Sequence, residues 1–171
     1  MYHAAQMAGT GPMAAVAGAV AEYVARELSR HSAEVIVENG GDLFIISSRE
    51  RLVAISAPGS PIDGRVALAA PPGERAVCTS SGTVGHSASA GRADAVVIAA
   101  ADGAVADAVA TATANRVREA ADVEAAIEWA RRRADLQQVV IVCGEAVGAW
   151  GQFELTSTGR NAGRGRGGAD V

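Results

Sequence analysis

The sequence from Ala93 to Asn115 reads ADAVVIAAADGAVADAVATATAN and joins two different periodicities. Its first part, 93–99, is a short apolar run typical of a buried strand. Its second part repeats Val and Ala at helical spacing behind Asp102, an N-cap residue, so we predict a helix over 103–118. The stretch therefore indicates an apolar strand followed by a helix that packs closely on other structure.

Asp107 is the only charged residue between Gly103 and Asn115, whereas a helix with a solvated face normally carries several charges. We therefore expect Asp107 to lie in a largely enclosed helix, where an unpaired carboxylate is costly. Thr111 follows one turn later on the same face. Such a carboxylate and hydroxyl are hard oxygen ligands that suit Mg²⁺ beside a phosphate. The alternative is an alanine-rich helix whose polar stripe simply meets solvent.

The segment from Thr79 to Ser87, TSSGTVGHS, contains five hydroxyl side chains, two glycines and one histidine. Glycine N–H groups and hydroxyls donate to anions, so the segment suits a pyrophosphate, although it lacks the lysine of a P-loop. The alternatives are a polar surface turn and a structural role for His86. A triad of Cys78, His86 and Asp94 has the residue types of a thiol nucleophile, but its spacing fits no local nucleophile signature.

Toward the N-terminus, Pro12 suits the first turn of a helix, and Gly18 with its alanine neighbours gives this helix a smooth surface. Asn39-Gly40-Gly41-Asp42, between two apolar runs, is a hairpin signal. The helix is predicted to be amphipathic, with one apolar stripe. That stripe consists of Met13, Val16, Ala17, Val20, Val24 and Leu28.

The remaining pattern predicts an α+β fold with one domain over 1–158. Residues 78–91 are expected to form a loop, and the tail 159–171, with three arginines and five glycines, is expected to be disordered. A more charged helix is predicted over 123–133. Strands are predicted over 34–38, 43–46, 51–56, 65–69, 138–143 and 152–156.

Composition excludes several classes of protein. Of 171 residues, 39 are alanine and 20 glycine, while aromatics make up 4%, so the core must rely on close backbone packing. All 15 basic residues are arginine, and the net charge of −4 without a basic stripe argues against nucleic acid as a partner. The apolar stretch 13–21 is too short to span a membrane, so we expect a cytoplasmic protein, with a homo-oligomer left open.

Four blocks that occur in order resemble the ApbE-like superfamily, and within it the branch of uncharacterised proteins. The blocks are Gly11 to Gly18 (GPMAAVAG), Glu38 to Asp42 (ENGGD), Cys78 to Ser87 (CTSSGTVGHS) and Ala106 to Ala112 (ADAVATA). The resemblance covers roughly Met7 to Leu155 and implies a T-fold-related sandwich of antiparallel strands covered by helices. ApbE enzymes are FAD:protein FMN transferases, which use Mg²⁺ to cleave FAD at its pyrophosphate and attach FMN to a threonine of an acceptor protein.

The resemblance also implies roles for individual residues. Asp107 and Thr111 match the Asp and Thr of the Ala-Asp-Ala-x-x-Thr-Ala motif, which bind the metal. His86 falls where the transferases carry a His-x-x-Asp-Pro segment, and is the implied base toward the acceptor hydroxyl. The implied flavin-binding residues are Asn39, Gly40, Gly41, Asp42, Thr79, Ser80, Ser81 and Gly82.

Three departures from the family pattern keep other functions open. The chain has no lysine, although the transferases carry one in the first block, and it lacks the Asp-Pro pair after His86. It also begins almost at the first block, so N-terminal elements of the family are expected to be missing. The explanations are a start position set too late, a protein that is a remnant of a longer one, or a partner chain that fills the gap. The alternatives to a transferase are a non-catalytic flavin- or nucleotide-binding accessory protein, linked through the family to sulfur assimilation, and a truncated structural product.

Overall fold

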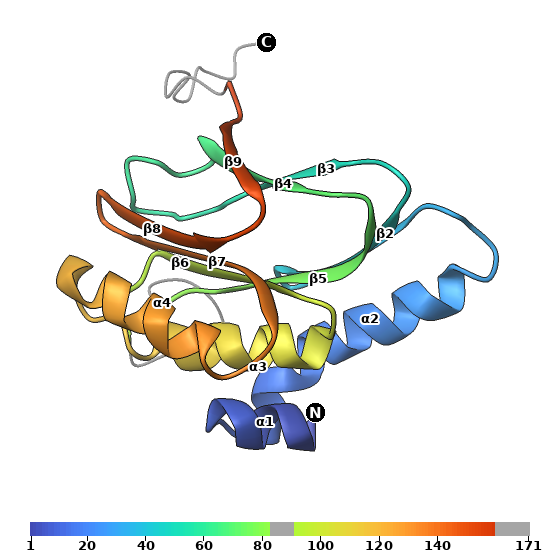
Figure 1. Cartoon of the computed structure of the whole chain (residues 1–171), viewed down its shortest axis with the longest axis horizontal. Helices are drawn as coiled ribbons and strands as arrows, with labels where there is room; N and C mark the ends of the chain where they lie inside the picture. Colours follow the sequence, from blue (N-terminus) through green and yellow to red (C-terminus); the bar gives the residue numbers. More distant parts are fainter. Residues whose placement is uncertain (83–90, 160–171) are drawn as a thin grey trace, which may run out of the picture.

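The computed structural model describes residues 1–82 and 91–159, in which two antiparallel sheets and a layer of helices are stacked (Figure 1). The large sheet has six strands in the order β1-β2-β5-β6-β7-β8, and the small sheet has the order β3-β4-β9. The α+β prediction is confirmed. The strands are β1 Val35–Asn39, β2 Asp42–Ser47, β3 Arg51–Ala54, β4 Val66–Ala70, β5 Gly73–Ser80, β6 Ala95–Ala100, β7 Leu136–Cys143, β8 Ala146–Gly151 and β9 Glu154–Ser157.

The helices cover one face of the large sheet, and the small sheet covers the other (Figure 1). One apolar core therefore lies between helices and sheet, and a second lies between the two sheets. The helical elements are α1 Tyr2–Ala8, the 3₁₀ turn η1 Pro12–Ala15, α2 Val16–Leu28, α3 Gly103–Ala114, the 3₁₀ turn η2 Ala120–Asp122 and α4 Val123–Arg131.

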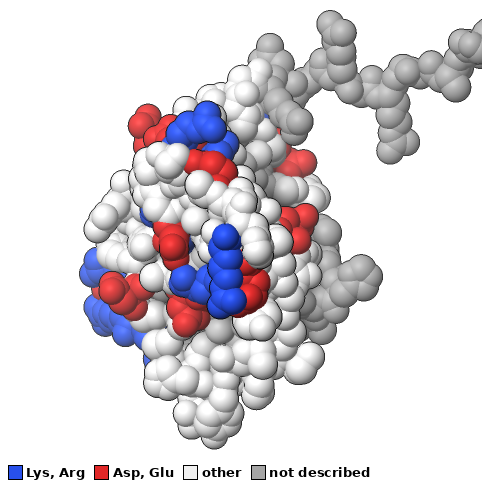
Figure 2. Space-filling model, turned by 90° about the vertical axis from the view of Figure 1, so that its right-hand side faces the viewer, with Lys and Arg blue, Asp and Glu red and all other residues white. Residues whose placement is uncertain are grey.

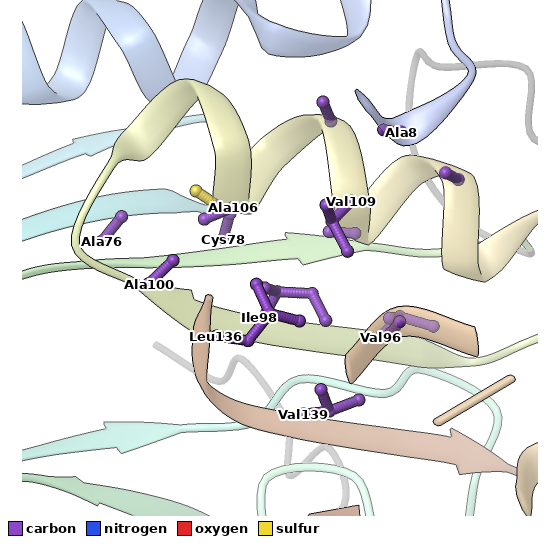
Figure 3. Packing of buried hydrophobic residues seen from close by; sticks show 14 of the residues in the cluster. Ala8, Ala76, Cys78, Val96, Ile98, Ala100, Ala106, Val109, Leu136 and Val139 are labelled. Carbon is purple, nitrogen blue, oxygen red and sulfur yellow. The ribbon is translucent and has the colours of Figure 1, made fainter. Parts of the chain in front are cut away.

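Helix α3 is the centre of the helical layer. Asp102 caps it as predicted, accepting a hydrogen bond from the Val105 N–H at 2.9 Å. Val109 of α3 points toward Ile98 of β6, and both side chains are fully buried (Figure 3). The helix ends at Ala114, four residues before its predicted end, and Asn115 is its C-cap. Its alanines allow the helix to lie close to the strands beneath it.

Helix α2 turns a different face to the core from the one its apolar stripe predicts. Its buried residues are Gly18, Ala21 and Ala25. Val20 and Leu28 of the stripe are 46% and 48% exposed. The apolar stripe does not face the core, because packing on β1, β2 and α3 selects the small residues that allow close approach. The large apolar side chains lie on the outer face instead.

Several strand boundaries also differ from prediction. Strand β5 (Gly73–Ser80) takes in the start of the predicted loop, because Ala76–Ser80 pair in register with residues of β6. Strand β8 (Ala146–Gly151) was not predicted, since its glycines and alanines carry little strand signal; Gly148 leaves room for Val123 of α4. The predicted disorder of the tail falls almost entirely on residues 160–171, outside the described residues.

Charged side chains on the face that includes the end of α2 occur in adjoining blue and red groups (Figure 2). The ion pairs there include Arg26 with Glu22 at 2.8 Å and Arg26 with Glu74 at 2.7 Å. In the described part of the chain, no helix is both long enough and apolar enough to cross a bilayer.

Candidate functional site

A tight hairpin turn places Asp42 at the edge of the helical layer. Gly40 and Gly41 adopt φ values of 65° and 103°, which favour glycine, and Asn39 pairs directly with Asp42 across the turn. Asp42 begins β2 and is 6% exposed. Its Oδ1 accepts a hydrogen bond from the Thr79 N–H of β5 at 3.1 Å. The hairpin prediction is confirmed, and the turn holds a buried carboxyl group in place.

Helices α2 and α3 cross where two glycines face each other. A Cβ on Gly18 would lie 2.2 Å from the carbonyl oxygen of Gly103, and a Cβ on Gly103 would lie 2.3 Å from that of Gly18. This close approach allows the Gly18 N–H to donate to Asp107 Oδ2 at 3.0 Å. Glu22 of α2 accepts from the Gly103 N–H at 2.7 Å and so holds the first turn of α3. The crossing therefore fixes the position of Asp107.

Asp42 and Asp107 are electrostatically coupled, although 65 residues separate them. Burial, followed by the charge of Asp107, raises the pKa of Asp42 to about 7. Burial also raises the pKa of Asp107, opposed by backbone hydrogen bonds from Gly18 and Ala17. Within the described residues, no arginine or histidine forms an ion pair with either carboxylate. The pair is thus a site of uncompensated negative charge.

Cys78 lies beside this pair on β5 and is fully buried. Burial, followed by the charges of Asp42 and Asp107, raises the pKa of its thiol well above the ordinary value. A thiol in this environment stays protonated at neutral pH, which disfavours a thiolate nucleophile. Asp94 instead accepts a hydrogen bond from the Gly144 N–H at 2.6 Å. The geometry thus gives no support to the triad interpretation of Cys78.

The other predicted site residues lie around the same end of the large sheet. Thr111 follows Asp107 by one turn of α3 and is half-buried. Asn39 is tied to α2, since its Nδ2 donates to the Ala17 carbonyl at 3.2 Å. Ser80 ends β5, and Ser81 and Gly82 follow it, with the Gly82 N–H donating to the Ala93 carbonyl at 2.8 Å. His86 lies outside the described residues.

Sequence reasoning did not assign site roles to Gly18 and Glu22. Gly18 supplies an N–H donor to Asp107, and Glu22 supports the helix that carries Asp107. Gly18 had a signal in the sequence, because a glycine among alanines predicts close approach of another backbone. Glu22 had none, because a single glutamate on an exposed helix face is typical of any surface.

The residues at the carboxylate pair fit Mg²⁺. In proteins this ion binds one or two carboxylates and keeps several waters or substrate phosphates as its other ligands. Asp107 and Asp42 supply buried carboxylates without a cation partner among the described residues, and Thr111 adds a hydroxyl on the same helix as Asp107. No cluster of three or more His, Cys, Asp or Glu side chains in residues 1–82 and 91–159 has the arrangement of a metal site. A metal here would therefore depend on substrate oxygens or water.

The stacked sheets and their helical cover define an ApbE-like α+β protein. The flavin transferase ApbE from Vibrio cholerae matches with a TM-score of 0.50 and 20% identity, over 84% of this chain and 48% of that one. The apo flavinyl transferase ApbE from Pseudomonas stutzeri matches with a TM-score of 0.51 and 18% identity, over 85% of this chain and 48% of the other. At these identities the match establishes the fold.

The chain belongs to the family described as "AbpE bacteria", whose model matches residues 1–155. A UPF0280 protein from Methanothermobacter thermautotrophicus is 40% identical over 95% of this chain and 66% of its own length. A second UPF0280 protein, from Methanoculleus marisnigri, is 45% identical over 90% of this chain and 63% of its own length. The chain thus spans slightly less than two thirds of the length of these two curated relatives.

Proposed function

We propose that this protein is a Mg²⁺-dependent flavin transferase that acts on FAD. The observation that carries the proposal is the buried pair of Asp42 and Asp107, brought together by the hairpin turn and by the α2–α3 crossing. Two interacting buried carboxylates are costly unless a proton or a cation neutralises them. The family and the fold of this chain support the choice of Mg²⁺ and a flavin dinucleotide.

In this proposal Asp107 and Thr111 hold Mg²⁺, which neutralises charge on the FAD pyrophosphate when bound. The hairpin residues 39–42 and the segment 79–82 bind and orient the dinucleotide. His86 takes the proton of an acceptor hydroxyl, whose oxygen then forms a bond to the FMN phosphorus. The bond from that phosphorus to the bridging oxygen breaks, and AMP leaves with this oxygen. The acceptor is a second protein, and a cytoplasmic location remains part of the proposal.

A second candidate is a non-catalytic accessory protein that binds a flavin or nucleotide. Under this alternative, the protein would assist an enzyme of sulfur assimilation. Two features of the sequence favour it: the chain contains no lysine, and the segment after His86 reads Ser-Ala-Ser-Ala-Gly without an Asp-Pro pair. Such a protein would bind the dinucleotide at the same residues without breaking the pyrophosphate.

The test is to incubate the purified protein with FAD and Mg²⁺, with water in place of the acceptor hydroxyl so that FMN and AMP are the products, and to quantify AMP by chromatography. We expect AMP release, reduced by about 100-fold or more in Asp107→Ala and by a smaller factor in Thr111→Ala. Glu124→Gln, an exposed position on α4, is the matched control and should retain full activity. Circular dichroism checks that each variant is folded.

Three outcomes distinguish the candidates. AMP release that depends on Asp107 supports the transferase. Retained flavin fluorescence without AMP release contradicts the transferase and supports the accessory protein. The absence of both flavin binding and AMP release contradicts both proposals.

A further inference from the structure

An arginine cluster surrounds Trp129 of α4, on a part of the molecule that the proposed function does not use. The guanidinium carbon of Arg116 lies 3.6 Å from the centroid of the Trp129 ring, and that of Arg133 lies 5.0 Å from it. Arg116 follows α3 and Arg133 follows α4, so two chain segments bring cations to one indole. Arg116 is further fixed by a hydrogen bond from its Nη1 to the Ala112 carbonyl at 2.6 Å.

The charges around Trp129 do not balance. Glu128 forms ion pairs with Arg131 and Arg132, each at 2.6 Å. Arg116 and Arg133 form no ion pair with any carboxylate in the described ranges 1–82 and 91–159. Burial and then repulsion from Arg133 lower the pKa of Arg116. Two mutually repelling guanidinium groups are thus held together in a protein whose net charge is −4.

An open hollow of about 470 Å³ adjoins this cluster. It is lined by Ala125, Glu128, Trp129, Arg132 and Arg133, so a solvent-borne anion has room to reach Arg133. The hollow is separate from the carboxylate pair. Asp107 lies on α3 seven residues before its last residue, Ala114, which is about 10 Å along the helix axis, and Arg116 follows beyond the C-cap Asn115.

We propose that Arg116 and Arg133 form an anion-binding subsite for a phosphate group. Phosphate suits the pair because each guanidinium presents several N–H donors in one plane, and a doubly charged phosphate neutralises both cations. Trp129 keeps the guanidinium planes in place, which reduces the ordering that binding requires. The ligand class is a phosphate monoester or a diphosphate, bound independently of the proposed flavin site.

The experiment uses Trp129 fluorescence in a Trp150→Phe background, because the chain has only two tryptophans. Inorganic pyrophosphate is titrated at constant ionic strength, with chloride as the balancing anion. We expect a saturable fluorescence change whose dissociation constant increases at least about tenfold in Arg133→Gln and in Arg116→Gln. Arg30→Gln, an exposed arginine of the α2 end paired with Glu27, is the matched control and should bind as tightly as the parent.

Arg133→Gln keeps the tight contact between Arg116 and Trp129, so it remains informative if Arg116→Gln loosens the packing of α3 and α4. Equal affinity in Arg133→Gln and the parent, or no saturable change, overturns the proposal. A response to a polyglutamate peptide but not to pyrophosphate also overturns it. Parallel titrations with AMP and with phosphatidic acid vesicles identify the source of the phosphate, because each Arg133-dependent response supports the site and names its carrier.

Discussion

At the candidate site, the negative charges of Asp42 and Asp107 are both disfavoured by burial, and the charge of Asp107 also disfavours that of Asp42. Each carboxylate has backbone donors, from Thr79 and from Gly18 respectively, but neither has a cationic partner among the described residues. The raised pKa of Asp42, about 7, means that the folded protein favours its protonated form. Replacing that proton by a divalent cation would relieve the same repulsion, and this connects the residue-level electrostatics to the proposed function.

Asp42→Asn should change the pH dependence of stability in the metal-free protein. The folded-state pKa of Asp42 is raised from 3.8 to about 7, so its contribution to stability is present below about pH 4 and is lost as pH rises toward 7. The substituted amide keeps an oxygen that accepts from the Thr79 N–H but carries no charge. We expect the variant to gain on the order of 1–4 kcal/mol relative to wild type between about pH 4 and pH 8.

The measurement is urea unfolding with EDTA present at several pH values. Glu124→Gln serves as the control, because it makes the same carboxyl-to-amide change at an exposed position of α4. A constant difference between Asp42→Asn and wild type across this range would refute the proposed origin of the shift.

At the scale of elements, the crossing of α2 and α3 determines where the site residues lie. Gly18 and Gly103 remove the side chains that would separate the two helices, and the carboxylate of Asp107 then receives the Gly18 N–H. The same close approach explains why Ala21 and Ala25, rather than the valines of the apolar stripe, face the core. Close packing of backbones thus takes precedence over burial of the larger apolar side chains.

Gly18→Ala should therefore destabilise the protein by about 1–3 kcal/mol or more. Its new Cβ would lie 2.2 Å from a backbone oxygen of α3, so one helix must shift. The control is Gly11→Ala, because a Cβ there meets nothing within 4 Å and its φ of −76° is open to alanine. Chemical denaturation of both variants provides the comparison. Equal stabilities of the two variants would mean that the crossing tolerates expansion.

On the scale of the whole molecule, the site depends on three structural units that meet. The β1–β2 hairpin supplies Asp42, β5 supplies the donor Thr79, and the helical layer supplies Asp107. Closing the helical layer over the large sheet, the stacking that Figure 1 shows, brings these groups together. Folding thereby creates the buried carboxylate pair, the proposed cation site, which the unfolded chain lacks.

Mg²⁺ should raise the melting temperature, and it should do so more strongly at about pH 8 than at about pH 5. Protons and the cation compete for the raised-pKa carboxyl groups, so a lower pH weakens metal binding. Differential scanning calorimetry with and without Mg²⁺ at both pH values measures this effect. Asp107→Ala should abolish it. A Mg²⁺ shift that is independent of pH, or one that persists in this variant, would count against the carboxylate pair as the binding position.

The sequence alone determined the features that depend on neighbouring residues. The hairpin at Asn39–Asp42 follows from two glycines that adopt positive φ, and the start of α3 follows from the Asp102 cap. The uncharged stretch around Asp107 indicated its burial, since a solvated helix would carry more charges. The four blocks in order were sufficient to identify the family.

Only the tertiary structure decided which face of α2 packs inward and which carboxylate meets Asp107. Both features depend on contacts between segments far apart in the chain, and periodicity within one segment does not encode them. Strand β8 shows the same limit, because its Ala- and Gly-rich sequence becomes a strand through pairing with β7. The side chains therefore specify local geometry and burial, whereas the partners of each surface are set by how the layers stack.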